Sequence, residues 1–312
     1  MKIIFFGTPA FAAEILTSMV HQGFVPAAIV TNPDRPRGRS VEPQPPPVKA
    51  LAQKIIPGVP IFQPEKASDP SFAPILEAFD ADLFVIVAYG EIIKKHLLEM
   101  PKKGCINVHG SLLPQYRGAA PVQRALMDGL QETGITIMYL VQKMDAGDII
   151  AQKKIPVDDQ INSGELLEKM SLEGAHLLGE VLHRFEKEKV LAVPQEETLV
   201  TMAPKITTEE CRVDWNLPAK ALHNKVRGVS PHPGAWCEVE LRGQRKRLKI
   251  LKTAVTAEKG TPGKILRWNQ DGIVIGCGDG ALQLVTIQLE GKKETSGGEF
   301  VKGHNGGELR FL

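Results

Sequence analysis

Cysteine is scarce in this 312-residue chain, and its cysteines stand far apart. They form no CxxC pair, and no paired histidines have metal-binding spacing. A structural zinc site needs clustered Cys or His ligands, and a small disulfide framework needs several paired cysteines. The sequence therefore predicts no metal site and no disulfide framework. The four cysteines are expected to be reduced and mostly packed: Cys105, Cys211, Cys237 and Cys277.

Long apolar runs are also missing. None reaches the roughly 18 residues that a membrane-spanning helix requires, and the N-terminal apolar run ends at Gly7 and Pro9 after a few residues. A signal peptide needs a longer apolar region followed by a cleavage site. With 43% hydrophobic and 24% charged residues, the chain is expected to be a soluble, globular, cytoplasmic protein with one large domain or two ordinary ones.

Short apolar runs alternate with helical patterns over the first 189 residues. Continuous apolar strands separated by helices are typical of a parallel sheet covered on both faces. The sequence therefore predicts a Rossmann-like α/β domain over residues 1–189. Strands are predicted at residues 2–7, 25–31, 81–90, 104–110, 134–141 and 148–157. Helices are predicted at residues 11–23, 91–100 and 164–190.

The turn after the first predicted strand reads FGTPAF and lacks the GxGxxG pattern. Those glycines are what allow a pyrophosphate to approach the N-terminus of the following helix. A dinucleotide-binding function is therefore disfavoured, although the predicted fold is the one that often carries it.

The pattern changes after residue 189. Residues 190–207 have no helical period and are predicted to be a linker. One helix is then expected at 216–229, followed by short strands punctuated by glycine. Five such strands suggest a small, OB-like β-barrel over residues 208–312. The strands are predicted at 235–241, 246–255, 263–268, 272–277 and 281–289.

Charge is distributed unevenly along the chain. Residues 206–312 hold 17 Lys and Arg against 12 Asp and Glu, a net charge of +5, which leaves 21 against 24, or −3, for residues 1–205. A basic domain suits a polyanionic partner because Lys and Arg that neutralise phosphates release counterions. A solvated surface with a modest excess of lysine explains the same composition.

A long insertion, NPDRPRGRSVEPQPPPVK, follows the second predicted strand at a point where the fold needs only a short turn. Loops of this length are usually functional or disordered. Three of its side chains, Arg35, Arg37 and Arg39, are candidates for phosphate binding within the loop 34–49. An exposed loop without a partner is the alternative.

Three polar residues are suited to acyl transfer. Moving a one-carbon acyl group to an amine passes through an oxyanion and releases a proton from the amine. Asn107 and His109 lie two apart on one predicted strand, so they share a face at its carboxyl end, where open α/β sheets place their sites. Asp145 follows another predicted strand in a DAGD turn. Each residue alone is more often structural, and only the combination favours catalysis.

The motifs resemble those of the folate-dependent formyltransferases, and within that family the enzymes that formylate initiator methionyl-tRNA. The similarity extends over nearly the whole chain. It is carried by FGTPAFA from residue 6, TNPDRPRGR from 31, NVHGSLLPQYRGAAPVQRAL from 107, TGITIM from 133, MDAGD from 144, DW at 214 and PG at 262.

The resemblance implies a set of roles. Asn107, His109 and Asp145 would be the catalytic residues, with Asn107 and protonated His109 stabilising the oxyanion while Asp145 holds His109 and assists proton transfer to the departing folate nitrogen. The co-substrate would be 10-formyltetrahydrofolate, with no metal and no covalent enzyme intermediate. The folate-binding residues would be Ser111, Leu112, Leu113, Pro114, Tyr89 and Gly90.

The acceptor implied by the resemblance is initiator methionyl-tRNA. The inserted loop would contact its acceptor arm through Arg35, Arg37 and Arg39, the basic barrel would contact its phosphates, and the enzyme would act as a monomer without a membrane partner. The loop departs from the family pattern after Arg39, where residues 40–42 read SVE in place of the adjacent lysines often found there.

Two other functions are compatible with parts of the pattern. A formyltransferase acting on glycinamide ribonucleotide or an amino-sugar nucleotide would share Asn107, His109 and Asp145, but it would not need a basic second domain. A non-catalytic RNA-binding protein would explain the basic domain and the loop, but it would leave those three residues without a role.

Overall fold

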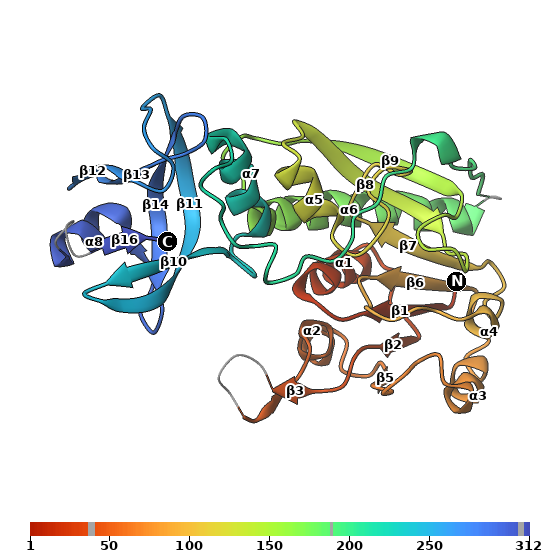
Figure 1. The fold of residues 1–312 in the computed structure, drawn as a ribbon. Helices are drawn as coiled ribbons and strands as arrows, with labels where there is room; N and C mark the ends of the chain where they lie inside the picture. Colours follow the sequence, from red (N-terminus) through yellow and green to blue (C-terminus); the bar gives the residue numbers. More distant parts are fainter. Residues whose placement is uncertain (37–40, 188–189, 305–308) are drawn as a thin grey trace. The chain divides into compact units, whose positions relative to one another are not determined.

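The computed structural model describes residues 1–36, 41–187, 190–304 and 309–312. The chain forms two compact units (Figure 1). Unit 1 comprises residues 1–118, 132–156 and 167–203, and unit 2 comprises residues 119–131, 157–166 and 204–312. The chain therefore enters unit 2 twice before it remains there from residue 204.

Unit 1 is built on a seven-stranded sheet with the strand order β5-β2-β1-β6-β7-β8-β9. The first five strands in that order are parallel, whereas β8 and β9 run antiparallel to their neighbours. The strands are β1 (Ile3–Gly7), β2 (Ala28–Val30), β5 (Ile61–Phe62), β6 (Leu83–Val87), β7 (Cys105–His109), β8 (Glu132–Tyr139) and β9 (Ile149–Pro156).

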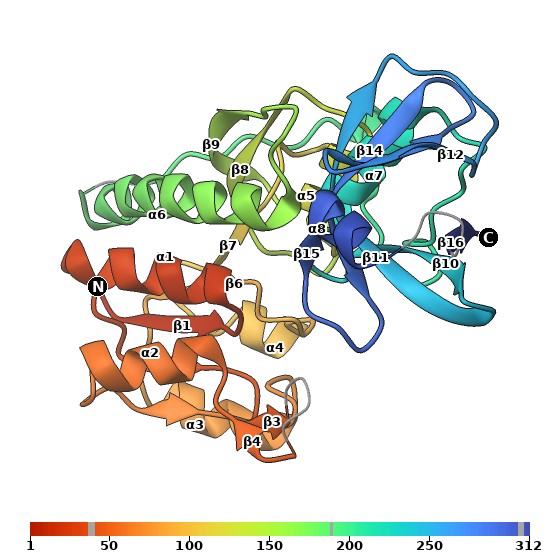
Figure 2. The same ribbon diagram turned by 90° about the vertical axis from the view of Figure 1, so that its left-hand side faces the viewer.

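Helices cover both faces of this sheet (Figure 2). One face carries α1, α2 and α6, and the other carries α3 and α4. Every residue of β1 and β6 is buried because these strands lie in the middle of the covered sheet. The helices are α1 (Ala10–His21), α2 (Pro47–Ile55), α3 (Ala73–Glu77), α4 (Lys95–Leu98) and α6 (Ser163–Lys187).

Unit 2 is built on an antiparallel sheet with the order β12-β13-β14-β11-β10-β16, and β15 pairs with β14. The strand β11 is long enough to pair with β10 and, through a bulged register, with β14. The sheet therefore curls into a nearly closed barrel. Its strands are β10 (Ala235–Leu241), β11 (Gln244–Thr256), β12 (Ile265–Asn269), β13 (Gly272–Gly276), β14 (Ala281–Leu289), β15 (Thr295–Ser296) and β16 (Leu309–Phe311).

The helices of unit 2 pack against this barrel and against one another. The apolar face of α7 (Ala219–Val229) joins the core of unit 2 through Leu222 and Val226. The short helix α5 (Pro121–Met127) packs on α7, and α8 (Gly297–Gly303) packs on β13 and β14. The fold thus confirms the predicted architecture of a Rossmann-like α/β part followed by a small β-barrel.

Three predicted elements differ in detail. The sheet is mixed rather than wholly parallel, because β8 pairs antiparallel with β7 and β9 pairs antiparallel with β8. The connection from β7 to β8 contains α5 and would allow either direction, whereas the return from β8 to β9 is too short for a parallel crossover. The predicted helix 91–100 is reduced to α4. Its first turn is absent because the Glu91 carboxylate accepts hydrogen bonds from the backbone N–H groups of Ala67 and Ser68, at 2.8 and 3.1 Å. The predicted strand 25–31 is reduced to β2.

All four cysteines are free and buried, as predicted. Burial raises the pKa of the Cys105 thiol to about 12, so this cysteine, at the start of β7, is not a thiolate nucleophile at neutral pH. In the described part of the chain, no helix combines the length and the apolar character needed to cross a membrane.

Candidate active site

The end of β7 presents Asn107 and His109 on the same face of the strand. β7 lies between the parallel strand β6 and the antiparallel strand β8, with His109 opposite Thr136. His109 is 6% exposed, while Asn107 is half-buried. Among the described residues, no hydrogen bond occupies the Asn107 side chain, so its amide donor is available to a substrate oxygen.

The His109 ring is oriented by a backbone carbonyl. Its Nε2 lies 2.9 Å from the carbonyl oxygen of Tyr116. A carbonyl only accepts, so Nε2 carries the hydrogen in this arrangement. The other ring nitrogen, Nδ1, faces the Asp145 carboxylate, with 3.7 Å between Nδ1 and Oδ2. That separation is an ion-pair distance and is too long for a direct hydrogen bond. The residue that orients His109 is therefore Tyr116, which the sequence did not indicate.

The Asp145 carboxylate is held from a third segment. Its Oδ2 accepts a hydrogen bond of 2.9 Å from the backbone N–H of Gly118. Gly118 has a φ of +130°, and a Cβ there would lie 2.6 Å from the carbonyl oxygen of Ala203, so glycine is required at this position. His109 and Asp145 thus come together beside residues 116–118, and Asn107 lies on the same face of β7 as His109.

The SLLP segment follows β7 and is fastened to the sheet by one buried hydroxyl. Thr136 Oγ1 donates to the carbonyl of Ser111 at 2.6 Å and accepts from the N–H of Leu113 at 3.1 Å. The Gln152 amide donates to the Leu113 carbonyl at 2.8 Å. Leu113 is buried, whereas Leu112 and Pro114 are half-buried. The predicted folate-binding loop is therefore a fixed surface that begins two residues after His109 in the chain.

The two other predicted folate-binding residues lie after β6. Gly90 is exposed with a φ of +90°. Tyr89 is 2% exposed and its ring packs edge-on against Phe6 at 5.6 Å between centroids. Burial raises the pKa of its hydroxyl, and that hydroxyl has no hydrogen-bond partner among the described atoms. The side chain of Tyr89 thus belongs to the core of unit 1.

Of the predicted RNA contacts, only Arg35 is described; Arg37 and Arg39 lie outside the described residues. Arg35 stands in the two-residue strand β3 (Arg35–Pro36), which pairs with β4 (Pro43–Gln44). Its guanidinium forms an exposed ion pair with Glu65 at 3.0 Å. An exposed pair of this kind contributes little stability, so Arg35 can exchange Glu65 for a phosphate at small cost.

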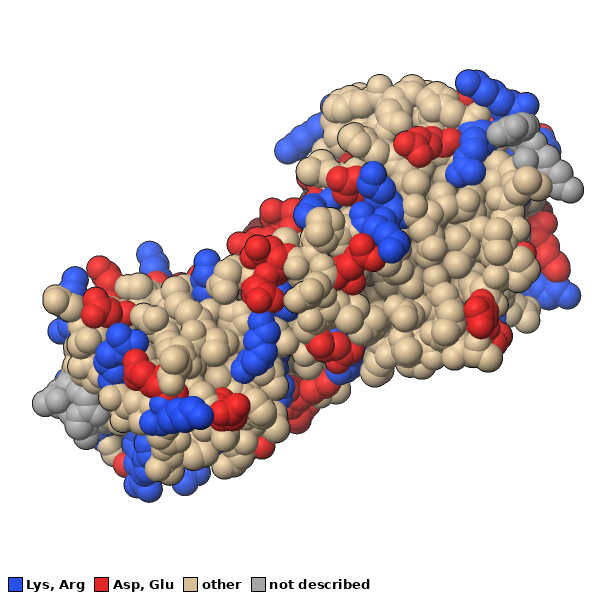
Figure 3. Space-filling model, turned by 90° about the horizontal axis from the view of Figure 1, so that it is seen from above, with Lys and Arg blue, Asp and Glu red and all other residues tan. Residues whose placement is uncertain are grey.

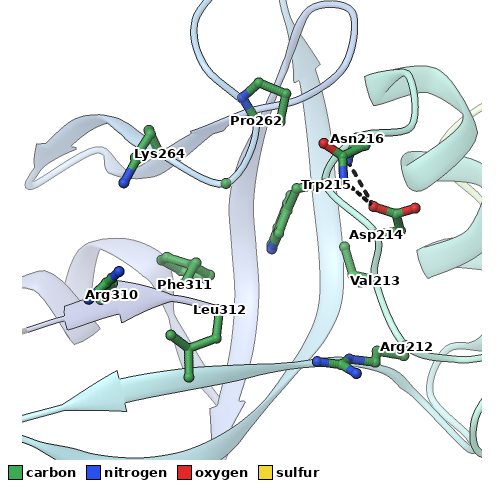
Figure 4. Close-up of a pocket in the computed structure, with 11 residues that line it drawn as sticks. Arg212, Val213, Asp214, Trp215, Asn216, Pro262, Lys264, Arg310, Phe311 and Leu312 are labelled. Atoms are coloured by element: carbon green, nitrogen blue, oxygen red, sulfur yellow. Dashed lines mark hydrogen bonds between the residues drawn. The ribbon is translucent and has the colours of Figure 1, made fainter.

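Unit 2 carries a separate cavity of about 560 Å³ that the sequence did not predict as a site. The DW and PG motifs meet there: Trp215 lies at its centre beside Phe311, and Lys264, Arg310 and Arg212 lie around it (Figure 4). We call this cavity the basic pocket. Trp215 and Phe311 meet edge-on with ring centroids 5.6 Å apart, so the floor is apolar, while the rim carries these three cations and the carboxylate of Asp214.

The rest of the charge on unit 2 is more mixed. On the face seen in Figure 3, basic side chains are interspersed with acidic ones and do not merge into one continuous patch. The +5 net charge of residues 206–312 is therefore a weak guide to where a polyanion binds. The rim of the basic pocket holds three cations and one carboxylate, and one of the cations, Arg212, is paired with Glu238 at 3.0 Å. Within the described ranges, no group of three or more His, Cys, Asp or Glu is placed to hold a metal ion.

Sequence families identify the class of protein that this fold and site define. Residues 1–182 match the formyl transferase family and residues 205–305 match the formyl transferase C-terminal domain. The chain belongs to the formyl transferase family. It is 48% identical to the methionyl-tRNA formyltransferase of Protochlamydia amoebophila, over 100% of this chain and 98% of that protein. It is 40% identical to that of Chlamydia caviae, over the same shares of both chains.

Solved structures show the same fold at low sequence identity. HypX from Aquifex aeolicus, solved with tetrahydrofolic acid, is 19% identical with a TM-score of 0.67, over 97% of this chain. This chain spans 48% of HypX, about half its length. WlaRD, a sugar 3N-formyl transferase solved with dTDP and 5-N-formyl-THF, is 16% identical with a TM-score of 0.66, over 94% of this chain and 99% of WlaRD.

Proposed function

We propose that this chain transfers the formyl group of 10-formyltetrahydrofolate to the α-amine of methionyl initiator tRNA. The observation that carries the proposal is the trio of Asn107, His109 and Asp145 at the carboxyl end of β7, in a chain 48% identical over its full length to a methionyl-tRNA formyltransferase. The products are N-formylmethionyl-tRNA and tetrahydrofolate, and no metal takes part. The reaction belongs in the cytoplasm, where we propose that the protein acts as a monomer.

The first step is attack of the amine on the formyl carbon. A new N–C bond forms, and the carbonyl π electrons move to the oxygen, which becomes an oxyanion. We assign Asn107 as the donor to this oxygen, because its amide is free at the strand end and next-but-one to His109. Donors aimed at a developing oxyanion contribute strongly to acyl transfer.

The proton released by the amine goes to the imidazole–carboxylate pair. His109 Nε2–H is committed to the Tyr116 carbonyl, so Nδ1 is the ring atom that exchanges a proton, with Asp145 3.7 Å away. In the second step the bond from the formyl carbon to the folate nitrogen breaks, and the pair returns the proton to that nitrogen. Proton transfer by positioned groups contributes about 10²- to 10⁴-fold in rate.

The donor is held beside this pair by the SLLP segment. We propose that Ser111, Leu112, Leu113 and Pro114, with Gly90 and the backbone of Tyr89, contact the folate. The anchoring of this segment by Thr136 supports the proposal, since a fixed loop places the formyl group without further ordering.

In this proposal, cationic side chains outside the trio of Asn107, His109 and Asp145 bind the acceptor tRNA. We propose that Arg35, Arg37 and Arg39 contact its acceptor arm and that the rim of the basic pocket contacts its phosphates. Among the described residues, Lys264 and Arg310 are exposed and form no ion pair, so they meet a phosphate without first losing a partner.

The proposal is tested by offering the purified protein 10-formyltetrahydrofolate together with methionyl initiator tRNA, uncharged initiator tRNA or a dTDP-amino sugar. Formylation of the charged tRNA alone is the expected result. Transfer to the amino sugar but not to the tRNA would show that the acceptor is an amino-sugar nucleotide and not methionyl-tRNA. Absence of transfer to any amine would refute the proposal.

A further inference from the structure

Asp145 is held in a backbone conformation that needs support. Its φ is +48°, in the left-handed region that L-residues other than glycine rarely adopt. Residues in this region carry backbone strain and persist only where the surroundings hold them. Its neighbour Gly147 is equally constrained, since a Cβ there would lie 1.8 Å from the carbonyl oxygen of Tyr139. The DAGD turn is therefore a strained loop fixed from outside.

The support comes from Gln195, in the segment between the two sequence domains. Its Nε2 donates to the carbonyl of Asp145 at 2.8 Å and to the carbonyl of Gly147 at 2.7 Å. The side-chain amide of Gln195 thus binds two backbone carbonyls of the turn at once. The same segment is paired with β9, because Val193 and Ile149 exchange two backbone hydrogen bonds of 2.8 Å.

Arg117 fixes the orientation of that amide. Its Nε and Nη2 donate to Gln195 Oε1 at 3.0 and 2.8 Å, and Nη2 also pairs with Glu197 at 3.0 Å. A guanidinium only donates, so the atom facing it is the amide oxygen and the two carbonyls of the turn must face the nitrogen. Arg117 is 1% exposed, a burial that requires all of these partners.

The backbone of Arg117 is hydrogen-bonded to the same segment that carries Gln195. Its N–H donates to the Thr201 carbonyl at 2.9 Å, and its carbonyl accepts from the Ala203 N–H at 2.7 Å. The next residue, Gly118, donates to the Asp145 carboxylate at 2.9 Å. The carboxylate and the backbone of Asp145 are therefore held by the same two segments, residues 116–118 and 193–203.

We propose that Gln195 and Arg117 are positioning residues that keep the Asp145 carboxylate beside His109 Nδ1 during formyl transfer. The assignment rests on the proposed function for its catalytic consequence, but the structural part stands without it. Neither residue reaches the reacting atoms. Each acts through Asp145, Gln195 directly and Arg117 through Gln195.

The substitution Gln195→Glu separates the contact of Gln195 with Arg117 from its contacts with the Asp145 and Gly147 carbonyls. The new carboxylate keeps the acceptor for Arg117 but removes both donors and places an oxygen against two carbonyl oxygens. We expect kcat to fall about 10- to 100-fold, as for small misplacements of reacting groups, with the KM for folate and for methionyl-tRNA unchanged. The matched control is Glu196→Gln, the reverse exchange at the adjacent exposed side chain, for which we expect wild-type kcat.

A double-mutant cycle tests whether Gln195 acts through Asp145. In an Asp145→Asn background, Gln195→Glu should lower kcat by less than about threefold, because the group that it positions has already been removed. The proposal would be overturned if the effects of Asp145→Asn and Gln195→Glu on kcat were fully additive. It would also be overturned if Gln195→Glu lowered kcat/KM only by raising KM.

Hydrogen exchange tests the structural part independently of catalysis. Gln195→Glu and Arg117→Met should both accelerate amide exchange in residues 143–148, while Glu196→Gln should not. Unchanged exchange there would overturn the proposal even if kcat fell. If the wild type formylates no tRNA, the proposed function fails, and the exchange result still decides whether Gln195 holds the turn.

Discussion

The two candidate sites differ in how their polar side chains are held. In unit 1, His109 and Asp145 are largely buried, and the segments that carry them are bound to one another by short hydrogen bonds. In unit 2, Lys264 and Arg310 stand exposed on the rim of the basic pocket. Side chains that are buried and hydrogen-bonded keep a fixed geometry, which the reacting groups of a catalytic site require. Exposed cations instead suit reversible, salt-sensitive binding of a polyanion.

The largest effect is expected where the geometry is tightest. His109→Ala removes the group that we propose exchanges the proton, so kcat should fall about 10²- to 10⁴-fold, with the KM for both substrates nearly unchanged. Steady-state formylation of methionyl-tRNA measures both constants. His176→Ala, at an exposed histidine of α6, is the control and should behave as wild type. A change confined to KM would place His109 in binding and remove the contrast between the two sites.

A smaller effect is expected where a buried hydroxyl supports the folate loop. Thr136→Val keeps the shape but leaves the Ser111 carbonyl and the Leu113 N–H without a partner. A buried polar group left unpaired costs about 1–3 kcal/mol, so the free energy of unfolding should fall by that order. The KM for 10-formyltetrahydrofolate should rise while the KM for methionyl-tRNA stays constant. Equal increases in both KM values would show that the loop does not serve the folate specifically.

The basic pocket is tested by salt. The Lys264→Ala, Arg310→Ala double variant should weaken methionyl-tRNA binding on the order of 10-fold at low salt. It should also reduce the slope of log affinity against log salt by about one for each phosphate that the variant no longer neutralises. The kcat at saturating tRNA should not change. Lys302→Ala, an exposed cation on α8 outside the pocket, is the control. An unchanged slope would mean that the pocket rim touches no phosphate.

The sequence predicted most of the fold because strands buried on both faces leave a continuous apolar pattern. The runs that became β1, β6 and β7 were readable for that reason, whereas the barrel strands β10 and β11 are buried mainly on one face and were readable as short runs between glycines. The direction of β8 was not predictable, because β8 is buried as continuously as the parallel strands and the connection that precedes it contains a helix, as a parallel crossover would.

The residues of the candidate site could be selected from the sequence, but their support could not. Asn107, His109 and Asp145 are residue types with well-known chemical uses, and the structure places Asn107 and His109 on one face of β7, with Asp145 3.7 Å from His109. Gln195 and Tyr116 have no such signal, since one lies in a stretch without period and the other acts through its backbone carbonyl. Their importance depends on which segments meet in space, and no local pattern records that.

The smallest predicted effect concerns the other deeply buried histidine, in unit 2. His223 is 4% exposed, with Nδ1 3.0 Å from Thr253 Oγ1 and Nε2 2.9 Å from the Asp159 carbonyl. Burial, aided by the nearby charges of Arg227 and Lys220, lowers the pKa of His223 from its usual 6.5. The carbonyl of Asp159 acts in the opposite direction and only partly offsets this.

The sign of the resulting pH dependence follows from proton uptake. Between the lowered folded pKa and 6.5 the unfolded chain binds more protons at this site, so stability rises with pH. The contribution of neutral His223 to the free energy of unfolding is complete above pH 6.5, and it is lost as the pH falls from 6.5 toward the lowered pKa of the folded state. All three tryptophans, Trp215, Trp236 and Trp268, lie in unit 2, so urea unfolding followed by tryptophan fluorescence reports on this unit. When the pH is lowered from 7.5 to 5.5, the urea concentration at the unfolding midpoint should decrease more in the wild type than in His223→Gln. An equal fall in both would show that His223 is not the group responsible.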